Sequence, residues 1–243
     1  MPTIVNWRDA NPVISHDNAV VWPCMQPVDS DAASNDRGVP ASVLRRLDVI
    51  TVHGIQGRKD SDHHRHSKRE QVYYIIKGTG EVVCGDQRLN IREGDALYLP
   101  SGLYHQICNP GEDWIVHHVI SRDVEEDTGA FVQRNWRDVT PETDSKGAVR
   151  WHLLEQKEPE NGGTLRGLAW IDREAIQPGG ESIERTEAHM EQIYYILGGI
   201  GTVILNGTMN HVREGDMIHI PVATPYAFSC TGSDWLTSLI VGG

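Results

Sequence analysis

The sequence predicts an all-β protein made of two tandem sandwich or barrel domains that arose by an internal duplication. Three observations predict this fold class. Two blocks of sequence recur along the 243 residues, and each copy is rich in short runs of β-branched and aromatic residues. Gly, Asn, Asp and Pro separate these runs at intervals of about 8–12 residues, the spacing of an all-β sandwich or barrel.

The duplication is visible in two repeated blocks. Residues 6–9 (NWRD) return as residues 135–138. Residues 55–114 align without a gap on residues 176–235, and both copies contain an EQ(V/I)YYI hexapeptide and an REGD tetrapeptide. Because the two blocks recur at different offsets, the first copy contains an insertion. We place the insertion in the polar stretch 29–39, whose composition predicts a surface loop.

Within the first copy, the apolar runs between turn residues predict strands at 72–76, 80–84, 96–99, 106–108 and 114–120. A strong helical period is absent, and we expect only a turn or two of helix near residues 40–47. The tryptophans recur in pairs, and we expect them to pack the N-terminal strand of each copy against a barrel. We place the domain boundary near Ala130, which gives domains 1–129 and 130–243.

Composition excludes several classes of function. Lys and Arg total 22 against 34 Asp and Glu, and the net charge of −12 disfavours a nucleic-acid partner or an anionic membrane surface. No apolar run reaches the roughly 18 residues of a membrane-spanning helix, and the N-terminus lacks the pattern of a secretory signal. We therefore expect a cytoplasmic protein. Its four cysteines are scattered without a CxxC pair, so neither a thiolate zinc site nor a disulfide scaffold is indicated.

Histidines in the first copy have the spacing of metal ligands. His64 and His66 precede a predicted strand, and in an extended chain residues two apart point the same way. Gln71 begins the next strand, and His105 follows the tight turn 100–104. Two imidazoles at this spacing, a third from a distant strand and an amide or carboxylate can hold one divalent ion and leave coordination positions open.

At these residues the chain resembles the cupin family, and in particular a bicupin. The first cupin motif is similar to the sequence around His64, His66, Gln71 and Gly78, with its leading glycine displaced to Gly57. The second motif is matched in full by Gly94, Pro100, Gly102, His105 and Asn109. The resemblance covers most of the chain. It implies two double-stranded β-helix barrels of antiparallel strands, the cupin or jelly-roll form, with a metal inside the first.

The fourth ligand position departs from the cupin pattern. Counting back from Gly78 places Gln71 there, although Glu70 stands beside it and could rotate in. By strand alternation Gln71 and Tyr73 share one face and Glu70 lies on the other, so we favour Gln71. A site of three histidines and a neutral amide keeps the full 2+ charge of the metal, which favours an anionic substrate. We expect Tyr73 and Glu70 to be the catalytic side chains.

The second copy lacks the ligands. In the ungapped alignment His64, His66 and His105 fall on Arg185, Glu187 and Tyr226, whereas Gln71 falls on Gln192. We expect this barrel to be structural, to supply a dimer surface or to hold a polar ligand. A local shift that unites His189, Glu187 and Gln192, with His219 nearby in sequence, would make a weak second metal site.

The resemblance leaves three hypotheses of function open. The first is a non-haem dioxygenase for a small, anionic organic substrate, with iron the expected metal and manganese, nickel, copper or zinc the alternatives. The second is a metal-dependent isomerase or lyase in which Tyr73 moves a proton, similar to the cupin lyases of dimethylsulfoniopropionate. The third is a non-catalytic binding protein. We expect a small-molecule substrate, no nucleic-acid or membrane partner, and a homodimer.

Overall fold

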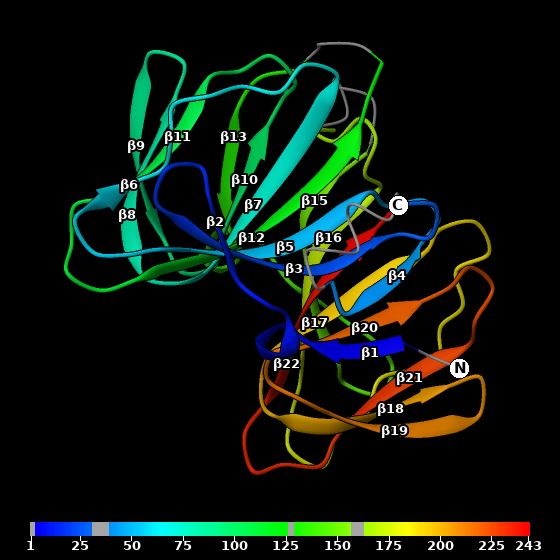
Figure 1. Cartoon of the computed structure of the whole chain (residues 1–243). Helices are drawn as coiled ribbons and strands as arrows, with labels where there is room; N and C mark the ends of the chain where they lie inside the picture. Colours follow the sequence, from blue (N-terminus) through cyan, green and yellow to red (C-terminus); the bar gives the residue numbers. More distant parts are fainter. Residues whose placement is uncertain (1–2, 31–38, 126–128, 157–162) are drawn as a thin grey trace.

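The computed structural model describes residues 3–30, 39–125, 129–156 and 163–243 and shows the two tandem β-barrels that the repeats predict. Figure 1 shows the first barrel in blue, cyan and green above the second in yellow, orange and red. Helix in the described residues is limited to two short 3-10 turns, η1 (Trp7–Asp9) and η2 (Trp136–Asp138). No helix of the described chain is long and apolar enough to span a membrane.

The first barrel consists of a large and a small sheet that face each other. The large sheet follows the order β13 (Val132–Asn135), β10 (Asp95–Leu99), β7 (Arg69–Lys77), β12 (Ile115–Asp123), β5 (Val49–Ile55), β3 (Ala19–Pro27) and β2 (Val13–Ser15), and β4 (Ala41–Leu44) pairs with β3. The small sheet follows the order β6 (Lys59–Asp60), β11 (His105–Asn109), β8 (Thr79–Cys84) and β9 (Gln87–Arg92).

The second barrel repeats this arrangement. Its large sheet follows the order β1 (Thr3–Asn6), β20 (Asp216–Ile220), β17 (Gln192–Gly198), β22 (Leu236–Gly242), β16 (Trp170–Ile176), β15 (Val149–Glu155) and β14 (Glu142–Thr143). Its small sheet follows the order β19 (Thr208–Arg213), β18 (Ile200–Leu205) and β21 (Tyr226–Cys230). Except for the parallel pair β3–β4, the strands described in both large sheets pair antiparallel.

The two repeats exchange their first strands. β1 pairs with β20 of the second barrel, whereas β13, which begins the second repeat, pairs with β10 of the first barrel. A cut near Ala130 therefore separates the repeats in sequence, but one strand from each side crosses to the other barrel. In this structure the exchange takes place within one chain.

The two repeated tetrapeptides are partners of each other. The Asn6 side chain donates to the Asp216 carboxylate at 2.8 Å, and Asn135 donates to Asp95 at 2.7 Å. Each NWRD segment thus binds the REGD turn of the barrel that its strand joins. The expected packing of the tryptophans is confirmed, since Trp7 lies against Trp22 and Trp136 against Trp151, with ring centroids 5.0 and 5.2 Å apart.

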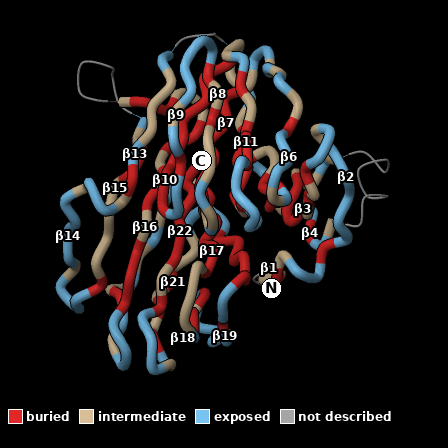
Figure 2. The backbone as a smooth tube through the Cα atoms, turned by 90° about the vertical axis from the view of Figure 1, so that its left-hand side faces the viewer, coloured by how far each residue is buried: buried red, intermediate tan, exposed pale blue. Residues whose placement is uncertain are grey.

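A continuous apolar core joins the barrels. The faces of β7, β10 and β12 that point away from the first barrel's interior pack on the equivalent faces of β17, β20 and β22, through residues such as Tyr74, Ile120, Tyr195 and Met217. Figure 2 shows buried residues concentrated along the strands in the middle of the molecule. Each barrel also has an interior core of its own. The large sheet of the first barrel is therefore held on both faces.

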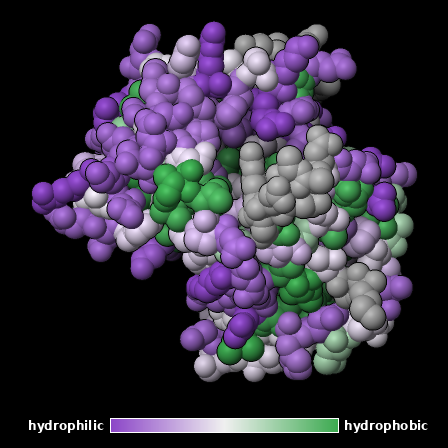
Figure 3. Space-filling view, in the orientation of Figure 1, coloured by the Kyte–Doolittle hydropathy of each residue, from purple (hydrophilic) through white to green (hydrophobic). Residues whose placement is uncertain are grey.

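One element differs from the expectation. Residues 40–47 contain strand β4 rather than a helical turn, because Ala41 and Ser42 continue the sheet beside Met25 and Gln26. Most of the polar stretch 29–39 lies outside the described residues. On the face drawn in Figure 3, hydrophilic residues predominate and the hydrophobic residues form separate patches, as the charge of the chain leads one to expect.

Candidate metal centre

Three histidines meet inside the first barrel. His64 lies in the segment between β6 and β7 and forms two backbone hydrogen bonds with His105, the first residue of β11, at 2.8 and 3.1 Å. His66 follows two residues later on the same side of the chain, and the Nε2 atoms of His64 and His66 are 3.1 Å apart. One ring nitrogen from each of the three lies within 4.8 Å of the others. The structure thus brings together the three histidines that the sequence predicts as metal ligands.

The outer nitrogens of His64 and His105 have acceptors, which turns their inner nitrogens toward a common point. His105 Nδ1 donates to the Leu103 carbonyl at 2.9 Å, which leaves its Nε2 as a buried atom without a hydrogen-bond partner. His64 Nδ1 lies 3.0 Å from the Asp62 carboxylate. Such outer hydrogen bonds are typical of histidines that bind metals.

Burial lowers the pKa of both His66 and His105 to about 4, with a further contribution from the neighbouring imidazoles. Neutral imidazoles offer lone pairs to a cation. Three imidazoles at this spacing, with the buried Nε2 of His105 lacking a hydrogen-bond partner, are a donor set suited to a divalent transition metal.

Gln71 and Tyr73 lie on the interior face of β7. The Tyr73 hydroxyl donates to the Gln71 amide oxygen at 3.4 Å, and the Gln71 amide nitrogen donates to Ser121 at 3.3 Å. The Tyr73 ring stands edge-on to the His105 ring, with centroids 5.8 Å apart. Burial raises the pKa of Tyr73 above its ordinary value, so its hydroxyl is protonated. Both side chains are therefore in the barrel with the histidines.

Glu70 is not part of this cluster. Its side chain is fully buried on the opposite face of β7, where it accepts hydrogen bonds from the backbone amides of Arg166, Gly167 and Leu168 of the second repeat. Rotation toward the histidines would leave three buried amides unpaired. The expectation that Glu70 can rotate in as a ligand or act in catalysis is corrected on this ground. The alternation argument that favoured Gln71 identified the right face.

The structure adds residues that the sequence patterns did not single out. The Asp62 carboxylate oxygen lies 3.0 Å from Nδ1 of both His16 and His64, and the His16 ring stacks on His64 at 4.5 Å. The position of Asp62 could have been predicted, because it precedes His64 by two residues and lies on the same side of an extended chain. His16 comes from the turn between β2 and β3, and no sequence pattern indicated that it would lie near His64.

The histidines of β5 and β12 divide between two environments. His53 and His117 face each other across β5 and β12, and the His117 ring lies 5.1 Å from Tyr73, so both line the barrel interior. Burial lowers the pKa of His117 to about 3. His118 points the other way and contacts Tyr195 of the second barrel, at 4.1 Å between ring centroids.

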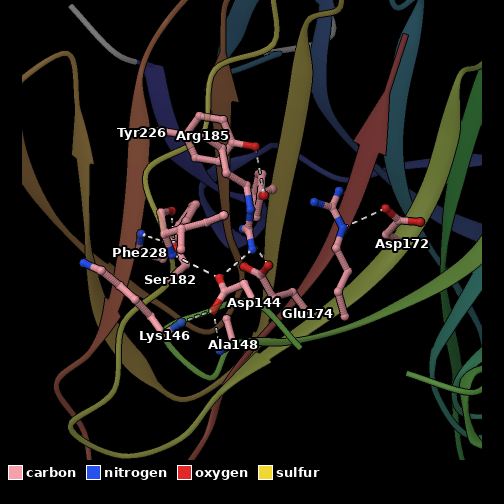
Figure 4. Close-up of polar contacts among 12 residues, drawn as sticks. Asp144, Lys146, Ala148, Asp172, Glu174, Ser182, Arg185, Tyr226 and Phe228 are labelled. Atoms are coloured by element: carbon pink, nitrogen blue, oxygen red, sulfur yellow. Dashed lines mark hydrogen bonds and ion pairs between the residues drawn. The ribbon is translucent and has the colours of Figure 1, made fainter. Parts of the chain in front are cut away.

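At the equivalent place in the second barrel, an arginine occupies the position of His64. Arg185 pairs with Tyr226 through backbone hydrogen bonds, as His64 pairs with His105. Its guanidinium lies between Asp144 and Glu174, at 3.0 and 2.6 Å (Figure 4). Gln192, equivalent to Gln71, accepts a hydrogen bond from the Tyr226 hydroxyl at 3.0 Å.

A second ion pair completes this interior. Arg150 binds the buried carboxylate of Asp172 at 2.8 Å. Burial raises the pKa of Glu174, partly offset by Arg185 and Arg150. His219 hydrogen-bonds to Glu191 at 3.0 Å on the side that faces the first barrel. Among the described residues, the two clusters of ligand atoms with metal-like spacing both belong to the first barrel.

Comparison with known proteins identifies the domain type. The family model described as "Cupin domain" matches residues 52–120 and again 172–242. A mannose-1-phosphate guanylyltransferase of Sinorhizobium fredii is 32% identical over 69 residues, which are 28% of this chain and 12% of that protein. An uncharacterized protein of Methanocaldococcus jannaschii is 33% identical over 48 residues, 20% of this chain and 38% of that protein. The chain therefore spans a minor part of these relatives.

Solved structures match over nearly the whole chain. A putative glyoxylate-induced protein from Pseudomonas aeruginosa has a TM-score of 0.79 at 16% identity and covers 98% of this chain and 87% of its own. Oxalate decarboxylase of Lactobacillus farciminis, in complex with formate, has a TM-score of 0.74 at 14% identity, with 98% and 85% covered. A variant of salicylate 1,2-dioxygenase from Pseudoaminobacter salicylatoxidans has a TM-score of 0.63 at 14% identity, with 80% and 69% covered. At these identities the likeness shows the fold.

Proposed function

This chain belongs to the cupin family, and from that premise we propose that its first barrel is a mononuclear metal centre that acts on a small organic anion. The observation that carries the proposal is the convergence of His64, His66 and His105 within 4.8 Å, with the buried Nε2 of His105 left without another partner. Gln71 is the proposed fourth ligand. Iron is the first candidate metal, and manganese, nickel, copper and zinc are the alternatives.

The proposed reaction is a dioxygenation, for which bound iron would supply the redox chemistry. Imidazole and amide groups bind a metal as neutral ligands, so this ligand set would leave the positive charge of the metal uncompensated and favour an anionic substrate. Solved cupins of the same fold carry formate or gentisate, which are small carboxylates. The apolar interior around Leu97 and Val119 excludes water from the bound substrate.

Tyr73 supports a second candidate, a metal-dependent isomerase or lyase. Its hydroxyl is buried, protonated and directed at the amide oxygen of Gln71, 3.4 Å away. A bound metal would supply Lewis-acid polarisation of a carbonyl or carboxylate. The Tyr73 hydroxyl would donate a proton to one atom of the substrate, and the phenolate so formed would take a proton from another atom. Both candidates use the same ligands and differ in their need for dioxygen.

The first experiment is elemental analysis of the purified protein and its His105→Ala variant. We expect about one transition metal per chain in the wild type and a near-complete loss in the variant, because a ligand has been removed. His211→Ala is the matched control, since His211 is an exposed residue of β19 and its variant should keep the metal. Full metal retention in His105→Ala would refute the site.

A substrate panel then separates the candidates. We expect the iron-loaded protein to consume dioxygen with one member of a panel of small carboxylates that includes oxalate, salicylate and gentisate. Turnover under nitrogen would instead support the isomerase or lyase. Saturable binding without turnover would identify a binding protein. Size-exclusion chromatography with light scattering tests the homodimer that we also propose.

A further inference from the structure

We propose that Glu70 is a positioning residue through which the second barrel fixes the geometry of the metal centre in the first. This inference rests on the proposed function. Glu70 stands directly before Gln71 in the chain, but its carboxylate leaves the first barrel and is held by three consecutive backbone amides of the second repeat. Within the part of the chain that the structure describes, the second barrel has no histidine triad, and this contact gives it a role in the site of its neighbour.

The hydrogen bonds between Glu70 and the second repeat are short, and Glu70 itself is fully buried. Arg166, Gly167 and Leu168 donate to the two oxygens of the Glu70 carboxylate at 2.6 to 2.8 Å, and the exposed fraction of Glu70 is 0%. Hydrogen bonds to a carboxylate are about twice as strong as those between neutral groups. A Cβ atom on Gly167 would come within 2.5 Å of the Arg122 side chain, which belongs to the strand beside β7. The backbone of the second repeat is therefore pressed against β12 where it meets Glu70.

The position of Glu70 between two ligands gives the contact its effect. His66 lies four residues before Glu70, with only a turn at Ser67 and Lys68 and the first residue of β7 between them. Gln71 follows immediately. Glu70 therefore fixes the chain at the point where it passes from one ligand to the next. A shift of β7 on release of Glu70 would move both Gln71 and His66 relative to His105, which is held by the other sheet.

The pseudo-symmetry of the molecule provides a matched control. Glu191 is the equivalent of Glu70, and its carboxylate accepts hydrogen bonds from the amides of Arg45, Arg46 and Leu47 of the first repeat. The two anchors lie at one interface and both accept hydrogen bonds from three consecutive backbone amides, and Glu191 also pairs with His219 at 3.0 Å. Glu191, however, precedes Gln192 in the barrel without the histidine triad, and the loop that it binds leads into β5, which carries none of the four proposed ligands. Loss of either anchor weakens the interface, and only loss of Glu70 should disturb the metal.

The experiment compares E70Q with E191Q as full-length, metal-free proteins. Each is titrated with Co²⁺ against a competing chelator, the visible spectrum of the cobalt form is recorded, and the urea midpoint of the apo form is measured. We expect both variants to lose stability. The dissociation constant of E70Q should rise by about tenfold, the lower end of what changes around metal ligands cause. The dissociation constant of E191Q should stay within about twofold of the wild type, since distant sites act independently.

The outcomes separate this inference from the proposed function. A changed cobalt spectrum and weaker binding in E70Q alone support the positioning role. Equal affinities and spectra in E70Q and E191Q, whether both are normal or both are weakened, overturn it, because a merely structural anchor would act equally from either side. A wild type that takes up no cobalt overturns the proposed function itself. If E70Q does not fold, the E70D and E191D pair keeps the charge, shortens the reach, and is judged by the same comparison.

Discussion

The same residue position is used in opposite ways by the two barrels. His64 and Arg185 occupy equivalent places, each in a short bridge to the first residue of a strand in the small sheet. His64 presents an imidazole lone pair, which suits a cation. Arg185 supplies a permanent cation, and Asp144 and Glu174 surround it. In the second barrel, therefore, the positive charge at this position comes from the guanidinium itself.

This arrangement predicts a large effect of Arg185→Met on stability. The Arg185 side chain is 12% exposed and that of Glu174 2% exposed, so the variant leaves buried carboxylates without their counter-charge. Breaking a buried ion pair from one side costs about 3–5 kcal/mol. The free energy of unfolding, measured with urea, should fall by that amount.

Arg8→Met is the matched control. Arg8 pairs with Glu214, but their side chains are 50% and 59% exposed, and an ion pair of this kind contributes about 1 kcal/mol or less. If Arg185→Met lowered stability no more than Arg8→Met does, the ion pairs of the second barrel would not organise its interior.

At the scale of elements, the strand exchange depends on two short motifs. Asn6 and Asn135 each have a buried amide that binds an aspartate of the opposite repeat's REGD turn, and each caps the 3-10 turn that follows. The two strands enter their sheets next to β20 and β10 in equivalent registers. The motif pair therefore joins β1 and β13 to the barrels that they complete.

Asn6→Ala and Asn135→Ala should each destabilise the protein to a similar degree. Either change leaves the buried Asp216 or Asp95 short of a donor, at a cost of about 1–3 kcal/mol. Asn210→Ala removes only an exposed hydrogen bond to Thr208 and should cost about 0.5 kcal/mol or less. Urea unfolding measures all three. A loss in Asn6→Ala no larger than in Asn210→Ala would mean that pairing of β1 does not depend on this motif.

At the scale of the whole molecule, the barrels share one core and two reciprocal anchors. Tyr74 and Ile120 of the first repeat belong to the same apolar cluster as Tyr195 and Met217 of the second. Glu70 and Glu191 bind the backbone of the opposite repeat, and β1 and β13 cross between the barrels. Neither repeat can unfold without exposing the core face of the other.

We therefore predict a single cooperative unfolding transition. Far-ultraviolet circular dichroism reports the strands of both barrels, and tryptophan fluorescence reports residues such as Trp7 and Trp151 that lie near the junction. The two signals should give the same urea midpoint, the usual test of two-state behaviour. Two separated transitions would show that the barrels are independent and that the contacts between them are weak.

The sequence by itself determined the fold class, the duplication and the spacing of the histidines, because these follow from local rules. Alternation along an extended chain puts His64 and His66 on one side of it, separates Gln71 from Glu70 by face, and is the same in any tertiary context. The glycine and proline positions of the turn before His105 are likewise local. The NWRD and REGD repeats were also visible, although their direct contact was not.

Only the tertiary structure decided which repeat each contact joins. Each barrel has an REGD turn to which the NWRD segment at the end of β1 could bind. The sequence pattern cannot say which of these two nearly identical turns it joins. In the crossed arrangement, Val5 of β1 and Val132 of β13 both pack against the apolar core that the two barrels share. Glu70 likewise stands beside Gln71 in sequence, but its carboxylate binds the backbone amides of Arg166 to Leu168, almost a hundred residues away. His16 reached His64 by the same long-range folding, which no local pattern encodes.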